Sequence, residues 1–141
     1  MLRSILSMVV GFLTLNAIVI ASGVTLQLSG HLPASAADIT PSYLAWSLGF
    51  TFLGAVLAGI VCGMVAQRYP LAHAAALAGT VFFISIGYTH RLWIAPPPDN
   101  PPHWYLLTLL LGSPIAIVLG GVWQQRRMLR HEQPLAAEPQ P

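Results

Sequence analysis

The chain has 141 residues, of which 55% are hydrophobic and 7% are charged, and its formal net charge at pH 7 is +2. Soluble domains carry about a quarter of charged residues, so this composition excludes an ordinary water-soluble fold. A mean hydropathy of +0.69 favours a protein whose surface faces lipid, because hydrocarbon requires apolar side chains on the outside.

Four segments of the chain are long and apolar enough to cross a bilayer, which takes about 20 residues of helix. They cover about residues 5–26, 43–66, 71–95 and 104–123. We therefore predict an all-α integral membrane protein, a four-helix bundle made of two antiparallel hairpins, with a single domain over residues 1–130.

The first segment begins like a secretory signal peptide, with Arg3 before an apolar run and the small residues Ala34-Ser35-Ala36 behind it. Signal peptides have apolar regions of about 7 to 15 residues with the cleavage site close behind. Here the run is longer and the small residues lie well past its end. We therefore expect this segment to be the first membrane helix.

The connections between the segments differ in length. A polar loop covers residues 27–42, whereas Gln67-Arg68-Tyr69-Pro70 is so short that it predicts an antiparallel hairpin opened by Pro70. The proline-rich residues 96–102 cannot continue a helix. After the fourth segment, residues 131–141 lack apolar periodicity and are predicted to form a disordered cytoplasmic tail.

Arginines beside the segment ends predict the orientation, because positive charge concentrates on the cytoplasmic side. With four crossings, one side carries Arg3, Arg68, Arg126, Arg127 and Arg130, and the other side carries only Arg91. Both termini are therefore expected in the cytoplasm. The same placement explains a pI of about 9.1 without a nucleic-acid partner.

Small residues at four-residue spacing predict where helices pack, because in lipid the attraction between helices comes from close backbone contact and hydrogen bonds. The second segment carries two such stripes and the fourth carries one. The residues are Ala55, Gly59 and Gly63, then Ala58, Cys62 and Ala66, and finally Gly112, Ala116 and Gly120. We expect them to face other helices, within the chain or across a homo-oligomer, and we expect Pro114 to kink the fourth helix.

Few residues could carry chemistry. Asn16 is expected to hydrogen-bond to a neighbouring helix, and His73 with His90 could hold a haem only with a partner subunit. The residues His31, His90, His103, Asp38 and Asp99 could bind zinc or copper, but their spacing matches no metal motif. The lone Cys62 excludes paired-cysteine redox and zinc arrangements. We expect no cofactor, no metal and no enzymatic activity.

Charged residues at the helix ends are candidates for contact with lipid or a partner. His90 and Arg91 suit a phosphate or carboxylate, and Arg126 with Arg127 suits anionic lipid. No carboxylate lies near mid-membrane, which argues against ion-coupled transport and against small multidrug-resistance transporters, which depend on an intramembrane Glu.

From the second segment onward the chain resembles a group of small four-helix bacterial inner-membrane proteins of unknown function. The resemblance rests on about 80 residues, and its motifs are Ala58-Gly59, the run from Ala66 to Ala74, Pro102-His103-Trp104-Tyr105, and residues 112–121. It implies the topology and the bacterial inner membrane, and it implies no activity.

The small-residue stripes and the lack of reactive groups favour a non-enzymatic accessory or scaffolding subunit that acts through helix–helix association. Its expected partners are the lipid bilayer and either further copies of the chain or a larger membrane complex. The alternative is a small oligomeric transporter or channel for an uncharged or amphipathic solute, lined by Thr, Ser, Asn and Gly.

Overall fold

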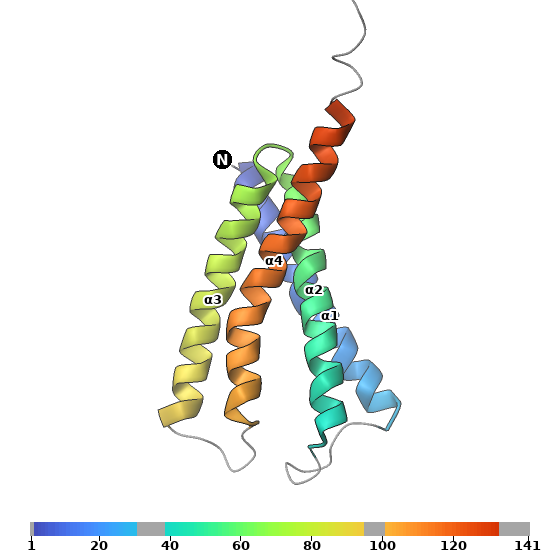
Figure 1. Cartoon of the computed structure of the whole chain (residues 1–141), viewed down its shortest axis with the longest axis vertical. Helices are drawn as coiled ribbons and strands as arrows, with labels where there is room; N and C mark the ends of the chain where they lie inside the picture. Colours follow the sequence, from blue (N-terminus) through green and yellow to red (C-terminus); the bar gives the residue numbers. More distant parts are fainter. Residues whose placement is uncertain (1, 31–38, 95–100, 133–141) are drawn as a thin grey trace, which may run out of the picture.

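The structure, a computed structural model, describes residues 2–30, 39–94 and 101–132. Within these ranges the chain forms four helices and no strand, so the all-α prediction is confirmed (Figure 1). The helices are α1 (Leu2–Leu28), α2 (Pro41–Ala66), α3 (Pro70–Ile94) and α4 (His103–Glu132). All four are long and apolar enough to cross a membrane, which indicates a multi-pass membrane protein.

Proline and hydroxyl residues mark the helix starts. Pro41 lies in the first turn of α2, and the hydroxyl oxygen of Thr40 accepts a hydrogen bond of 3.3 Å from the amide of Tyr43. Pro70 is the first residue of α3. Proline suits these positions because the first amides of a helix have no acceptor within it.

Helix α4 continues past its apolar segment, which ends near Trp123, as far as Glu132. The residues beyond Trp123 include glutamine, arginine, methionine and leucine, which are good helix formers in water or headgroups as well as in lipid. The first two residues of the predicted tail, His131 and Glu132, are therefore helical, and residues 133–141 lie outside the described ranges. The helix also runs through Pro114 without a break.

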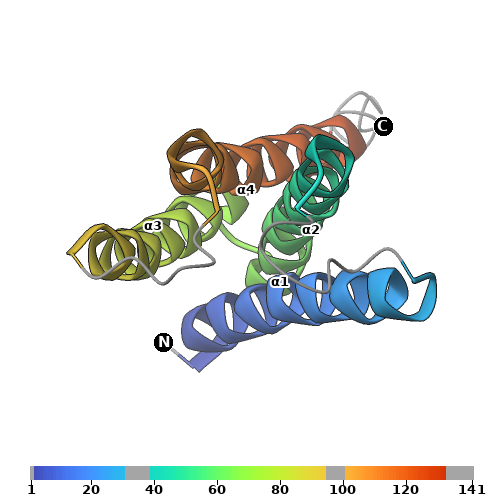
Figure 2. The same ribbon diagram turned by 90° about the horizontal axis from the view of Figure 1, so that it is seen from below.

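Successive helices run in opposite directions, so that α1 begins, α2 ends, α3 begins and α4 ends at one end of the molecule (Figure 1). We call this the terminal end. Seen along the bundle, the order of the helices is α1, α2, α4, α3, with α2 and α4 in the middle (Figure 2). Helix α1 leans across the others, and the side between α1 and α3 is the least closely packed.

Small residues make up most of the core. Ala55, Ala58, Cys62 and Ala74 have no exposed surface, and among larger side chains Leu77 and Ile117 are almost completely buried. The buried cluster comprises Leu15, Ala55, Ala58, Cys62, Ala74, Leu77, Ala78, Val81, Ala116 and Ile117. Such a core allows the helix backbones to approach closely, as expected where packing rather than water exclusion holds helices together.

A three-residue connection joins α2 to α3 at the terminal end. The amide of Gln67 donates to the carbonyl oxygen of Gly63 over 3.3 Å and caps α2. Gln67 and Tyr69 have φ values of 56° and 53°, a left-handed conformation that is uncommon for residues other than glycine. Arg3 donates to the side-chain oxygen of Gln67 over 3.1 Å, which ties the start of α1 to this connection.

Candidate functional site

The predicted small-residue stripes of α2 and α4 lie against each other. A Cβ atom added at Gly59 would collide with the carbonyl oxygen of Ile117, and one added at Gly120 would collide with the carbonyl oxygen of Val56. Ala55, Ala58 and Ala116 are buried in the same region. These residues are therefore packed against one another within the chain.

The other two glycines of the stripes also face side chains of the same chain. A Cβ atom at Gly112 would lie 2.6 Å from Cε1 of Phe52, and one at Gly63 would lie 3.1 Å from Cγ of Gln124. Gln124 is 8% exposed, and its side-chain oxygen is buried without a hydrogen-bond partner among the described residues. Gly63 thus makes room for a buried carboxamide whose acceptor is unsatisfied.

One hydrogen bond between side chains joins the two central helices near the other end. The hydroxyl groups of Ser47 on α2 and Tyr105 on α4 lie 2.7 Å apart. In the sequence Tyr105 stands out only as part of the motif Pro102-His103-Trp104-Tyr105. No spacing rule could have paired it with a serine 58 residues away.

An apolar cavity, which we call the apolar groove, lies between α1 and α3. It has a volume of about 330 Å³, and its lining surface is apolar. Its lining residues are Ile5, Met8, Val9, Phe12, Leu13, Leu77 and Thr80. Ile5, Val9 and Leu13 are 62%, 47% and 59% exposed, so the groove opens sideways toward the surroundings of the bundle.

A second cavity, which we call the polar chamber, adjoins the apolar groove and has a volume of about 240 Å³. Every helix contributes one polar side chain to its lining: Asn16 from α1, Thr51 from α2, Ser85 from α3 and Ser113 from α4. Phe12 lines both cavities, so the two are neighbours, and we call the pair the crevice.

The prediction that Asn16 bonds to a neighbouring helix is wrong, because its side chain bonds within α1. Its side-chain nitrogen donates over 2.8 Å to the carbonyl oxygen of Phe12, one turn back in α1, because a carbonyl at that distance is within reach of a short polar side chain. The hydroxyl of Thr51 likewise donates to the carbonyl oxygen of Ser47 over 2.8 Å. Both side chains keep an oxygen that can accept a further hydrogen bond.

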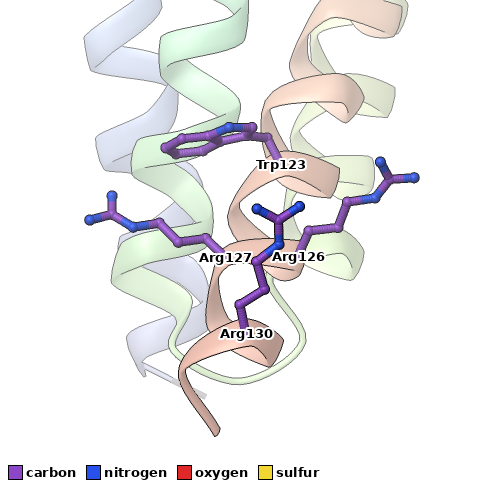
Figure 3. A pocket seen from close by; sticks show the side chains of 4 residues that line it. All are labelled: Trp123, Arg126, Arg127 and Arg130. Atoms are coloured by element: carbon purple, nitrogen blue, oxygen red, sulfur yellow. The ribbon is translucent and has the colours of Figure 1, made fainter. Parts of the chain in front are cut away.

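Three arginines and a tryptophan form a cationic surface on the last turns of α4. Trp123, Arg126, Arg127 and Arg130 line an open hollow of about 450 Å³ (Figure 3). The guanidinium of Arg127 lies 5.6 Å from the centre of the Trp123 ring, which is within the range of a cation–π contact. Arg126 points away from Arg127 on the other side of the helix (Figure 3). Such a surface can bind phosphate or carboxylate groups.

His90 and Arg91 lie on the last turns of α3, and both are exposed. His90 also borders a small cavity with Ile86, Thr89 and Leu110. His73, near the start of α3, has its Nδ1 atom 3.1 Å from the carbonyl oxygen of Tyr69. Among the described residues no three of His, Cys, Asp or Glu gather closely enough to hold a metal ion. His31, Asp38 and Asp99, which the sequence analysis considered as possible metal ligands, lie outside those residues.

One exposed face of α3 was missed in the sequence. It carries Ala72, Ala75, Ala76, Gly79, Phe83, Ile86 and Gly87, which recur at helical spacing, and a Cβ atom added at Gly79 or Gly87 would meet nothing within 4 Å. The four-residue spacing of Ala72 with Ala76, and of Ala75 with Gly79, is the signal that could have found it.

The fold therefore belongs to the class of four-helix chains with the dimensions of a multi-pass membrane protein. No family model, curated protein or solved structure with which the chain was compared matches it.

Proposed function

We propose that this chain is a non-enzymatic, multi-pass protein of the bacterial inner membrane that acts as an accessory or scaffolding subunit through helix–helix association. The observation that carries the proposal is the exposed small-residue face of α3. Its alanines and glycines stand on the outside of the bundle, where a partner's transmembrane helix can approach the α3 backbone closely.

The positions of the arginines support an orientation with both termini in the cytoplasm. Arg3 at the start of α1, Arg68 between α2 and α3, and the arginines ending α4 all belong to the terminal end. Arg91, in the last turn of α3, belongs to the opposite end. The anionic inner leaflet attracts basic clusters by about 1 kcal/mol per Arg near the surface, and the Arg126 and Arg127 surface suits its phosphates. The resemblance to small bacterial membrane proteins supports the same location.

Co-purification of the full-length protein in mild detergent tests the scaffolding proposal. We expect a partner subunit or a further copy of the chain to accompany the wild type and to be lost when Ala76 or Gly79 is changed to leucine. Ala76 is exposed, and a Cβ atom added at the half-buried Gly79 would meet nothing within 4 Å, so both substitutions should leave the monomer folded. The matched control is Ala45→Leu, at an exposed alanine of α2, which should retain the partner. A strictly monomeric wild type without companions would contradict the proposal.

A second candidate function is transport of an uncharged or amphipathic solute, and the polar chamber favours it. Four helices contribute hydroxyl or amide groups to this chamber, which is the lining expected for a solute without charge. Reconstitution into liposomes tests this function directly. Solute flux that falls when Ser113 is replaced by valine would support it, and liposomes with no permeability to any uncharged solute would contradict it.

A further inference from the structure

We propose that the crevice between α1 and α3 binds a single-chain amphiphile with an uncharged, hydrogen-bonding head group, which enters sideways from the lipid. The head group lies in the polar chamber and the chain lies in the apolar groove. This proposal concerns the same polar chamber as the transport function and names a class of ligand for it. It requires only that the ligand binds, and not that it passes across the membrane.

The polar chamber carries more hydrogen-bonding capacity than the chain itself satisfies. The described part of the structure gives the hydroxyl groups of Ser85 and Ser113 no hydrogen bond, and Ser113 is only 6% exposed. A ligand with one donor and one acceptor, such as an alcohol, satisfies these groups together with the free acceptor of Asn16.

The lining of the chamber also selects against charge. None of the residues that line it is acidic, basic or a histidine. A carboxylate or ammonium placed there would lose its hydration without gaining an opposite charge, which is costly in a medium of low polarity. The head group that fits is therefore polar and neutral.

The apolar groove suits a hydrocarbon chain. It has a volume of about 330 Å³ and its lining surface is apolar, so it offers no hydrogen-bonding partner to water. Ile5, Val9 and Leu13 leave it open toward the surroundings of the bundle. A flexible hydrocarbon chain has the chemistry to fill it.

The two cavities are neighbours, so one ligand can place its head in the chamber and its chain in the groove. Phe12 belongs to the wall of both cavities, and Leu77 and Val81 lie one turn apart on α3, one in each lining. The exposed side chains of Ile5, Val9 and Leu13 on α1 leave the groove open to lipid. A long-chain amphiphile dissolved in the bilayer can therefore enter without crossing an aqueous phase.

Photolabelling of the full-length protein in detergent micelles tests the inference. The probe is a long-chain fatty alcohol with a diazirine near the end of its chain, and labelled peptides are mapped by mass spectrometry. We expect saturable labelling of residues 5–13 and 77–80. The Ser85→Ala and Ser113→Val substitutions should each weaken apparent affinity about fivefold, as expected for the loss of one buried hydrogen bond.

Two further variants separate binding from folding. Thr80→Trp fills the groove at an exposed position of α3, so the monomer should stay folded while labelling is lost. Ser22→Ala, at a hydroxyl that bonds within α1 and lines neither cavity, should label like the wild type. Thermal unfolding of each variant in the same detergent verifies folding.

Competition experiments identify the features of the ligand. Unlabelled fatty alcohol should displace the probe, whereas an alkane or a fatty acid of equal length should compete at least fivefold less well. Equal competition by the alkane would overturn the inference. So would labelling that does not saturate and that is the same in the Ser113→Val and Thr80→Trp variants as in the wild type. Saturable labelling together with no solute flux in liposomes would support the binding proposal and contradict the transport function.

Discussion

Gly59 on α2 and Gly120 on α4 set how closely these two helices approach, because neither site has room for one more carbon. We expect Gly59→Ala to lower the free energy of unfolding by about 1–3 kcal/mol, the usual cost of forcing extra carbon into a packed interior. A Cβ atom at Gly59 would meet the carbonyl oxygen of Ile117, which belongs to a helix backbone and cannot yield easily. Unfolding by SDS titration in mixed micelles measures the change.

The control for this substitution lies on the same helix. A Cβ atom at Gly49 would meet nothing within 4 Å, so Gly49→Ala should leave stability unchanged or raise it by up to about 1 kcal/mol, since alanine is the better helix former. If Gly59→Ala and Gly49→Ala lowered the free energy of unfolding equally, the α2–α4 contact would not be the cause of either loss.

At Gln124 the expected effect has the opposite sign. The buried side-chain oxygen of this residue has no partner among the described residues, and an unsatisfied buried acceptor costs about 1–3 kcal/mol. Methionine has a similar shape without the polar group, so Gln124→Met should keep or raise the unfolding temperature in detergent. A clear fall would show that the Gln124 oxygen has a partner, such as a bound water.

At the scale of the elements, the bond between Ser47 and Tyr105 couples α2 to α4. A double-mutant cycle with Ser47→Ala and Tyr105→Phe should give a coupling energy of about 0.6 kcal/mol and at most about 1.7 kcal/mol, the range for side-chain hydrogen bonds between membrane helices. SDS titration of the wild type, the two single variants and the double variant measures the free energies of unfolding. Additive effects would contradict a direct bond across the 2.7 Å that separates the two oxygens.

The four helices could be predicted from the sequence, but which helix packs against which could not. Four uninterrupted apolar runs indicate four helices, because each run satisfies the length requirement by itself. The spacing of Gly59 with Ala55 and Gly63 predicts close packing, but the same spacing fits any facing helix. Only the structure pairs Gly59 with α4. The end of α4 was missed because a helix can continue into water after its apolar residues end.

The crevice could not be predicted for a related reason. Its polar lining consists of one residue from each helix, and these residues lie far apart in the sequence, from Asn16 to Ser113. Each of them alone is an ordinary hydroxyl or amide in a membrane helix. Their convergence depends on the lean of α1 and on the order of the helices (Figure 2), and neither is encoded in a local pattern.

At the scale of the whole molecule, the composition and the exposed side chains fit four helices that cross a bilayer. Only 7% of the residues are charged, and the described arginines stand at helix ends or between helices. Large apolar side chains such as Phe83 and Leu28 are 74% and 84% exposed, which is stable in lipid and would drive aggregation in water. Both the exposed faces and the arginine positions follow from this arrangement.

Cysteine labelling with a membrane-impermeant maleimide tests this arrangement most directly. On a Cys62→Ala background, which removes the natural thiol, single cysteines are placed at Thr40, Tyr69 and Pro102, all exposed. In intact bacterial cells the cysteines at 40 and 102 should react, while the one at 69 should react only after the cells are permeabilised. Labelling of all three positions from the same side would contradict a chain that crosses the membrane between them.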